Sequence, residues 1–406
     1  MSTHQNPKTS PSATITAPYQ LSKSSEIIAN NDDLLVQILV KLPLKSLIKF
    51  KSVSKHWQSL ISDVPFPSSV SGLFLDSLSV NNRKYDFVDL NESNPSSNAP
   101  TRSLTFNNNP SGLRIIQSCN GLLLCKSNHS SSFMDLDPNE NYYVYNPTTN
   151  NYTVLPPLSS RSIRGLNLAF DPSKSPHYKV LCVWSGHNIG DNFHFETYSS
   201  KTRTWRISGN SVDAHNYAEF QNGVFCNGAV HWRDKLLQPF LYFNVDEEQL
   251  SQMPSPPPPQ HWNVEQNYFR YFGESSGHLH LIYEIYNRGT PHLHVYEMEM
   301  DYSGWFVKYR IDCSQFSTAF PEIISRRLKF QNVNYYFYSI VYLVRGDVDE
   351  ESCAVIRIPG KVIRYNFKSK TFHKLCHIEA GRELESCGFL PGWSSTHECI
   401  ESLALV

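Results

Sequence analysis

The stretch NDDLLVQILVKLPLKSLIKFKSVSKHWQSLI, residues 31–61, is the most clearly helical part of this 406-residue chain. Its apolar residues recur at helical spacing, and Pro43 divides them into two groups. The first group predicts a helix that has Asn31 or Asp32 as its N-cap and ends before the proline. A second short helix is expected after the proline, and a third over the segment that contains Trp57.

Three short helices cannot form a core that is stable alone, because chains below about 40 residues usually need a cross-link or a partner. The apolar stripe of the first helix consists of Leu34, Leu35, Ile38, Leu39 and Leu42, and that of the third consists of Val53, Trp57, Leu60 and Ile61. These stripes therefore either cap the domain that follows or bind another protein.

The order Asp-Leu-Leu, Ile-Leu, Leu-Pro, Lys-Ser-Leu, Val, Lys, Trp and Ser-Leu-Ile within this stretch resembles the F-box of plant proteins. The resemblance implies that the stretch binds the Skp-family adaptor of SCF-type cullin-RING ubiquitin ligases. It places six residues in that contact or in support of it: Leu34, Ile38, Leu39, Leu42, Pro43 and Trp57.

One departure from the family pattern lies just before the first helix. The family has Leu-Pro where this chain has Asn30 and Asn31. Losing such an apolar anchor removes about 1.5 to 3 kcal/mol of burial, which predicts weaker adaptor binding. Five lysines of the stretch form either a solvated face or a surface for an acidic partner: Lys41, Lys45, Lys49, Lys51 and Lys55.

Length and composition predict two units in a reducing compartment. Residues 1–28 are rich in Ser, Thr, Pro and Asn and are predicted to be a disordered tail, followed by an F-box helical domain over 29–65 and a β domain over 66–406. The net charge of -1 favours neither nucleic acid nor a membrane as partner. The nine cysteines include no CxxC pair, and a signal peptide or membrane-spanning segment is not evident. We therefore expect a cytoplasmic and/or nuclear protein.

From residue 66 onward, short alternating runs broken by Gly, Pro, Asn and Ser predict an all-β domain. Four segments predict hairpins in which an aromatic residue pairs with a large apolar residue seven positions later: VYNPTTNNY, TYSSKTRTW, YFNVDEEQL and RYNFKSKTF. A fifth, VYEMEMDYSGW, is expected to pair Tyr296 with Trp305 across a longer turn. The leading aromatic residues are roughly 45 to 70 residues apart, near the period of propeller blades.

A tight glycine turn before an alternating strand is the second repeated feature, seen in NGLLLC, NGAVHW, GHLHLI and PGKVIRY. Residues 70–90 are expected to pair with the segment CGFLPGWSSTHECIESLAL near residue 400, which would remove the exposed edges of the sheet array. The predicted fold class is a small three-helix F-box followed by an all-β kelch-like β-propeller of about six blades, with irregular blades allowed. A distorted stack of sheets without closure is the alternative.

The β domain also resembles a known family. The segments CNGLLLC, YVYNPTTNNYTVLPP, LAFDPSKSPHYKVLCVW, GVFCNGAVHW and VIRYNFKSKTFHKL occur in the order typical of the F-box-associated, kelch-like domain that follows plant F-boxes. The resemblance implies a domain that recruits a target protein, whose identity varies within such families.

Two histidine pairs are candidate metal ligands. His278 with His280, and His292 with His294, each share one face of a strand. A pair holds a metal only with further ligands, and neither a cysteine nor an acidic cluster accompanies it in sequence, so we expect no metal site. The chain has no GxSxG, HExxH or phosphate-loop motif, so we expect neither catalytic residues nor a cofactor.

A proline-stiffened stretch, MPSPPPPQ, is followed by His261 and Trp262. These two residues form either a target-binding element, since aromatic residues are frequent in binding hot spots, or part of a plain connector.

These features predict a substrate-recognition subunit of an SCF-type ligase that has no catalytic activity of its own. The alternative is a scaffold or binding protein whose weakened F-box no longer engages a ligase. A third class, an intracellular enzyme, would be tested by metal analysis of the purified protein.

Overall fold

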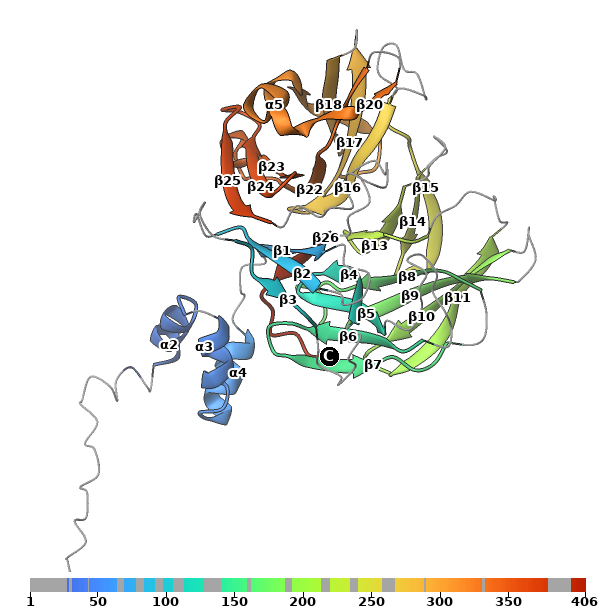
Figure 1. The fold of residues 1–406 in the computed structure, drawn as a ribbon. Coiled ribbons are helices and arrows are strands. Elements are labelled where there is room, and N and C mark those ends of the chain that lie inside the picture. Colours follow the sequence, from blue (N-terminus) through green and yellow to red (C-terminus); the bar gives the residue numbers. More distant parts are fainter. Residues whose placement is uncertain are drawn as a thin grey trace, which may run out of the picture. The chain divides into compact units, whose positions relative to one another are not determined.

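The computed structural model of the protein describes residues 28, 31–42, 44–63, 69–77, 84–91, 98–104, 113–127, 140–158, 162–186, 192–212, 220–233, 240–257, 267–287, 290–330, 333–378 and 396–406 (Figure 1). The predicted tail therefore lies outside the described residues, apart from Ile28. The chain divides into two compact units, Met1–Phe66 and Pro67–Val406.

The first unit contains the helices α2 (Asp32–Leu39), α3 (Leu44–Phe50) and α4 (Lys55–Asp63). Both α2 and α3 pack against α4. Among the described residues of this unit, four apolar side chains are buried: Leu35, Leu39, Leu47 and Ile61. The helices are short, so burial of these side chains, more than helix propensity, stabilises them.

The predicted fold class, a three-helix F-box followed by an all-β kelch-like propeller, is wrong as stated. Its three-helix part is only loosely supported, because helical conformation also occurs at Ile28, before α2, and the helices have 9 residues or fewer. The propeller part fits, with one short helix added in the second unit, α5 (Ser314–Ala319). This helix has no side-chain cap and is held by Phe316, which packs edge-on against Tyr338 and Tyr365. Such a tertiary contact leaves no local sequence signal.

Six four-stranded antiparallel sheets in the second unit form the blades of a β-propeller (Figure 1). Blade 1 comprises β26 (Thr396–Ile400), β1 (Val70–Ser77), β2 (Lys84–Asp89) and β3 (Thr101–Arg102), and blade 2 comprises β4 (Leu113–Cys119), β5 (Leu122–Ser127), β6 (Tyr142–Asn146) and β7 (Asn151–Val154). Blade 3 comprises β8 (Ser162–Ala169), β9 (Lys179–Ser185), β10 (Phe193–Ser199) and β11 (Thr204–Val212), and blade 4 comprises β12 (Val224–Cys226), β13 (Ala229–Trp232), β14 (Phe240–Asn244) and β15 (Gln249–Met253). Blade 5 comprises β16 (Asn267–Ser275), β17 (His278–Asn287), β18 (Thr290–Met298) and β19 (Trp305–Asp312), and blade 6 comprises β22 (Ser339–Val344), β23 (Cys353–Ile358), β24 (Lys361–Asn366) and β25 (Phe372–His377).

The connection between blades 5 and 6 contains additional structure. After α5 come a 3-10 turn, η1 (Pro321–Ile323), and the separate two-stranded sheet of β20 (Ile324–Phe330) and β21 (Val333–Tyr336). A second 3-10 turn, η2 (Asp349–Glu351), joins the first two strands of blade 6. These elements account for the long interval between the fifth and the last predicted hairpin.

The ring is closed by strands from the two ends of the propeller sequence. β26 pairs antiparallel with β1, as expected, with Leu73 opposite Glu398 (Figure 1). Blade 6 packs on blade 1 through an apolar cluster that includes Val341 and Val88. Each of the five other junctions between successive blades also has its own apolar cluster. The described residues therefore form a closed propeller, which excludes the open stack.

The four predicted hairpins have the predicted cross-strand pairs, namely Tyr145 with Tyr152, Tyr198 with Trp205, Phe243 with Leu250 and Tyr365 with Phe372. The fifth pairing is wrong. Trp305 lies opposite Met298, and Tyr296 lies opposite Val307 after an irregularity in the ladder. Met298 and Trp305 are seven positions apart, as are the pairs of the other four hairpins, so the turn is not longer and Met298 takes the position of the leading aromatic residue.

The glycine turns also behave as expected, with one difference. Asn120-Gly121 and Asn227-Gly228 have positive φ at both positions, as two-residue hairpin turns of the primed type require. Both turns join the first two strands of their blades. The turn at Gly360 joins β23 and β24 instead, which are the second and third strands of blade 6.

Candidate functional site

The start of α2 is set by Asn31. The backbone of this residue is extended, and its side-chain oxygen accepts a hydrogen bond from the Leu34 amide at 3.1 Å. Asp32 follows in the first turn, and its Oδ1 lies 2.9 Å from Nε2 of His56 on α4. Asn31, one of the two departures from the family pattern, therefore caps the helix. Asn30 lies outside the described residues.

The apolar stripe of α2 divides into two faces. Leu35 and Leu39 are buried in the core of the helical unit, and only 1% of the Leu39 surface is accessible. Leu34 and Ile38 are 38% and 46% exposed, although they belong to the same stripe in sequence. They are four residues apart and therefore adjacent on the helix surface. Of the six predicted contact residues, Leu34 and Ile38 are the exposed ones on α2, whereas Leu39 is buried in the core of the unit.

The other predicted contact residues are in less exposed positions. Leu42 is half-buried just after the end of α2. Trp57 is half-buried on α4, where its ring packs edge-on against Phe50 with centroids 5.4 Å apart. Its backbone amide is capped by the hydroxyl of Ser54 at 3.1 Å. Pro43 lies outside the described residues, so the structure does not place it.

Val40 and Val53 are also exposed and were not predicted to be. Val40 is 44% exposed at the end of α2, and Val53 is 61% exposed in the turn before α4. Val53 had been assigned to the buried stripe of the third helix. Its position follows from the start of α4 at Lys55, which the Ser54 cap determines. We define Leu34, Ile38, Val40 and Val53 as the exposed apolar set.

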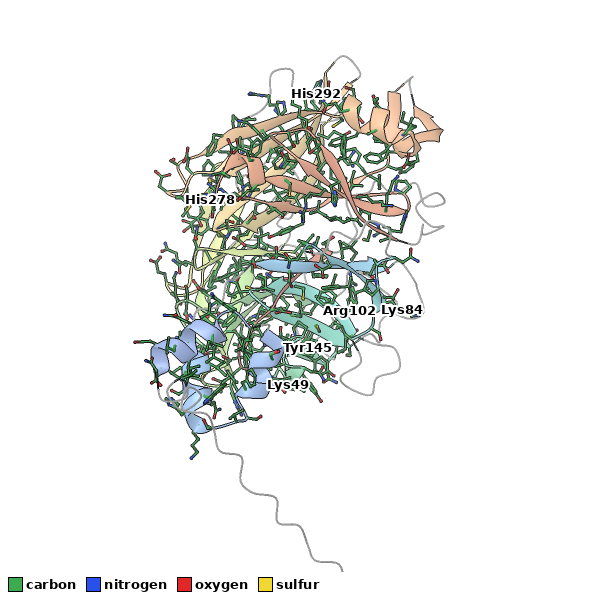
Figure 2. The ribbon with its side chains drawn as sticks, turned by 90° about the vertical axis from the view of Figure 1, so that its left-hand side faces the viewer. Lys49, Lys84, Arg102, Tyr145, His278 and His292 are labelled. Carbon is green, nitrogen blue, oxygen red and sulfur yellow. The ribbon has the colours of Figure 1, made fainter. Side chains whose placement is uncertain are left out.

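Lysines accompany the exposed apolar set. Lys41, Lys49 and Lys55 are exposed, and Figure 2 shows the side chain of Lys49 on α3. Lys51 is half-buried, and this burial lowers the pKa of its ammonium group. The side chain of Lys45 is not among the described ones. A partner that covers this unit would need acidic groups to match these cations.

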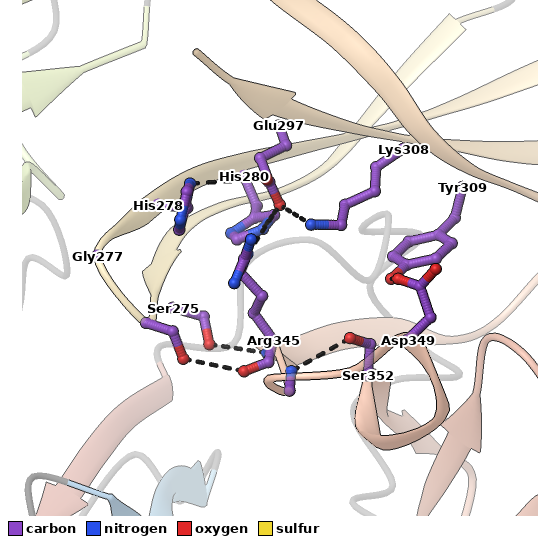
Figure 3. Close-up of polar contacts among 12 residues, drawn as sticks. Ser275, Gly277, His278, His280, Glu297, Lys308, Tyr309, Arg345, Asp349 and Ser352 are labelled. Atoms are coloured by element: carbon purple, nitrogen blue, oxygen red, sulfur yellow. Dashed lines mark hydrogen bonds and ion pairs between the residues drawn. The ribbon is translucent and has the colours of Figure 1, made fainter. Parts of the chain in front are cut away.

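The first of the two predicted histidine pairs contacts a carboxylate in blade 5 (Figure 3). His280 Nε2 lies 2.9 Å from Oε2 of Glu297, and His278 Nδ1 lies 3.5 Å from its Oε1. Lys308 on β19 and Arg345 after β22 also reach Oε2, at 2.5 and 3.2 Å. The cluster therefore ties three strands of blade 5 to blade 6.

In this Glu297 cluster one carboxylate meets two cations, Lys308 and Arg345. Burial alone would raise the pKa of the Glu297 carboxyl, but hydrogen bonds from His280 and Lys308 hold that pKa well below its usual range. Burial lowers the pKa of His280 and His278, so both rings favour the neutral form. Burial and the nearby Arg310 lower the pKa of His294 to about 4. Over the part of the chain that the structure describes, no group of three or more His, Cys, Asp or Glu residues has a metal-binding arrangement.

Comparison with known proteins identifies the family. Residues 31–69 match the sequence profile of the F-box domain, and residues 73–287 match that of the F-box associated beta propeller domain. The chain belongs to the family of F-box proteins with an associated β-propeller. F-box protein At5g07610 of Arabidopsis thaliana is 36% identical to this F-box protein over 382 residues, which cover 88% of each chain. F-box protein At5g49610 of the same plant is 28% identical over 231 residues, which cover 53% of this chain and 62% of that protein.

Solved structures add little to this assignment. An oligogalacturonate lyase in complex with manganese has 10% sequence identity and a TM-score of 0.38, with 80% of this F-box protein and 86% of that chain covered. A score of that size supports no conclusion about activity.

Membership in this family supports a substrate-receptor role in SCF complexes, since F-box domains bind Skp-family adaptors there. F-box and β-propeller domains are typical of adaptors and receptors rather than enzymes. None of the helices in the described ranges has the length and hydropathy needed to span a membrane. His261 and Trp262, the predicted target-binding residues of this F-box protein, lie outside the described residues.

Proposed function

We propose that this F-box protein is the substrate-recognition subunit of an SCF-type cullin-RING ubiquitin ligase. In this proposal, residues 29–65 bind the Skp-family adaptor and residues 66–406 recruit the target protein. The observation that carries it is the exposed apolar set on a short helical unit, in which four apolar side chains of the described residues are buried. A unit this short leaves little margin of stability, so covering the exposed set with a partner would be favourable.

The proposed contact consists of residues that touch the adaptor and residues that hold them in place. Leu34 and Ile38 touch the adaptor directly because they are exposed on one face of α2. Leu39 acts indirectly by holding α2 against the core of the unit, and Leu42, Pro43 and Trp57 complete the edge of the surface. The exposed lysines would face acidic groups of the adaptor, as electrostatic complementarity requires.

The proposed role in ubiquitination requires no covalent chemistry by this chain. Holding a target near the charged ubiquitin-conjugating enzyme raises the effective concentration of the acceptor lysine. The closed propeller suits this task because apolar clusters hold its successive blades together. His261 and Trp262 stay candidate target contacts on sequence grounds.

The direct test is co-purification of adaptor and cullin with the full-length chain from plant cells. Leu34→Asp with Ile38→Asp places two charges on the exposed face and leaves Leu35 and Leu39 in the core. The double variant should lose adaptor and cullin while it still captures targets. The matched control is Ile207→Asp, which changes a residue that is 62% exposed on the propeller and should retain both partners.

Two outcomes would contradict the proposal. A folded double variant that recovers the adaptor at the wild-type level would refute the docking role of α2. A wild-type chain that captures targets but recovers neither adaptor nor cullin would favour the alternative, a scaffold or binding protein outside the ligase.

A further inference from the structure

Residues Glu401–Val406 follow strand β26 and lie along blade 2. Ala404 and Val406 pack against the apolar cluster between blades 2 and 3, whereas Leu405 is 76% exposed. Ser402 is half-buried and Glu401 is exposed. Leu403 is half-buried as well, so Glu401 and Leu405 are the exposed residues of the segment. The contacts with blade 2 and its apolar cluster are made at positions 402, 404 and 406, which are alternate, as in an extended segment.

The blade holds this segment mainly by its backbone. Nδ2 of Asn146, a fully buried residue at the end of β6, donates hydrogen bonds to the carbonyl oxygens of Ser402 and Ala404 at 3.0 and 2.9 Å. Oγ1 of Thr148 accepts a hydrogen bond from the Ser402 amide at 3.1 Å. These hydrogen bonds involve only backbone atoms of the segment, so a different sequence in the same conformation could form them.

A glycine makes room for the segment. A Cβ on Gly121 would lie 2.3 Å from the Ser402 Cβ, which is an overlap. The equivalent turn of blade 4 has Gly228, where a Cβ would meet only Lys174 Nζ at 3.6 Å. The turn chemistry is the same in both blades, so the close approach at Gly121 comes from the segment itself. We call Gly121, Asn146, Thr148 and the adjoining apolar edge the blade 2 site.

The segment is held less firmly than the strand before it. β26 is paired with β1 along its length, but none of the backbone–backbone hydrogen bonds of the described residues involves residues 401–406. Its inward side chains are small, and Val406 is the largest of them. Segments with few buried contacts and no ladder bonds open locally at low free-energy cost.

We propose that the blade 2 site is a peptide-binding site, which residues Ser402–Val406 occupy in the free protein and an extended segment of the target occupies after displacing them. The matching segment has small side chains at the first two inward positions and a β-branched side chain at the third. The inference rests on the proposed recruiting function and adds to it the class of target segment.

The test uses a labelled peptide of residues 401–406, Glu-Ser-Leu-Ala-Leu-Val, and a chain that lacks Ser402–Val406. Fluorescence anisotropy should show binding to the shortened chain. The affinity of the peptide for the full-length chain should be lower by about ten-fold or more, because the tethered residues compete at an effective concentration in the millimolar range. A control peptide with Asp in place of Ala404 and Val406 should not bind.

A second variant tests the backbone contact. Thr148→Val in the shortened chain removes the acceptor for the Ser402 amide and should weaken the peptide roughly three- to ten-fold, as expected for one lost hydrogen bond. Unchanged affinity would place the peptide elsewhere.

A second variant serves if the shortened chain does not fold. In that case the full-length chain with Ala404→Asp and Val406→Asp takes its place, and it should bind the labelled peptide better than wild type. A folded variant of either kind that binds the labelled and control peptides alike would overturn the proposal. Capture of targets from plant cells by the full-length chain reports the recruiting function separately, and adaptor co-purification on the same variants reports adaptor binding by the helical unit.

Discussion

At the scale of single residues, the sequence predicted the apolar stripe of α2 but not which of its side chains are buried and which are exposed. Leu34, Leu35, Ile38 and Leu39 form one stripe by spacing, yet two of them are buried and two are exposed. The division depends on how α4 packs against α2, which the local pattern does not contain. Asn31 has two interpretations in sequence, as a lost apolar anchor and as one of two candidate N-caps, and in the structure it is the cap of α2.

The Glu297 cluster supports a prediction at this scale. Because the pKa of Glu297 is lower in the folded protein than the unfolded value of about 4.3, its carboxylate stabilises the fold above that value and loses the effect as the pH falls. Glu297→Gln should lower the free energy of unfolding at pH 7 by about 2 to 3 kcal/mol, since it leaves Lys308 and Arg345 without their acceptor.

Urea unfolding at pH 7 and pH 3 measures this effect. The gap between wild type and Glu297→Gln should narrow at pH 3, whereas Glu299→Gln, an exposed change beside the same strand, should match wild type at both values. An equal gap at both pH values would mean that the carboxylate charge is not what stabilises the cluster.

At the scale of elements, hairpins were predictable because their signals are local. In three of them an asparagine oxygen accepts amide hydrogen bonds within the turn, at Asn146, Asn244 and Asn366. The register of these hairpins follows from that short motif. The fifth hairpin and α5 were not predicted correctly. In the hairpin Met298, not an aromatic residue, pairs with Trp305, and α5 depends on aromatic packing from strands far away in the chain.

The two glycine turns allow a matched prediction. Gly228→Ala should cost about 1 kcal/mol, because its positive φ disfavours a side chain while the space around it is open. Gly121→Ala should cost more, since it has the same strain and also overlaps Ser402. Thermal unfolding of both variants compares them directly. Equal losses of stability would show that residues 402–406 do not lie over Gly121.

At the scale of the whole molecule, closure of the ring was predictable from the pairing of the first and last strand patterns. The boundaries of the tail and the two domains remain predictions. Closure has a chemical consequence for the cysteines. All eight cysteines of the described residues are buried, and burial raises the pKa of Cys226 to about 12 and of Cys353 to about 11.

Thiol reactivity therefore reports on the intact ring. In a Cys387→Ser background, which removes the one cysteine outside the described residues, the native protein should react slowly with a thiol reagent at all eight positions. The same protein in denaturant should react fully. Fast selective modification of Cys399 on β26 would indicate that the closing strand separates from β1.

The central claim is that the exposed face of α2 binds the adaptor, and calorimetric titration of the full-length chain with a purified Skp-family adaptor tests it most directly. Leu34→Asp with Ile38→Asp should weaken binding by about 30-fold or more, since central apolar contacts often contribute 2 kcal/mol or more, while Ile207→Asp should bind as wild type does. A folded double variant with wild-type affinity would contradict the account.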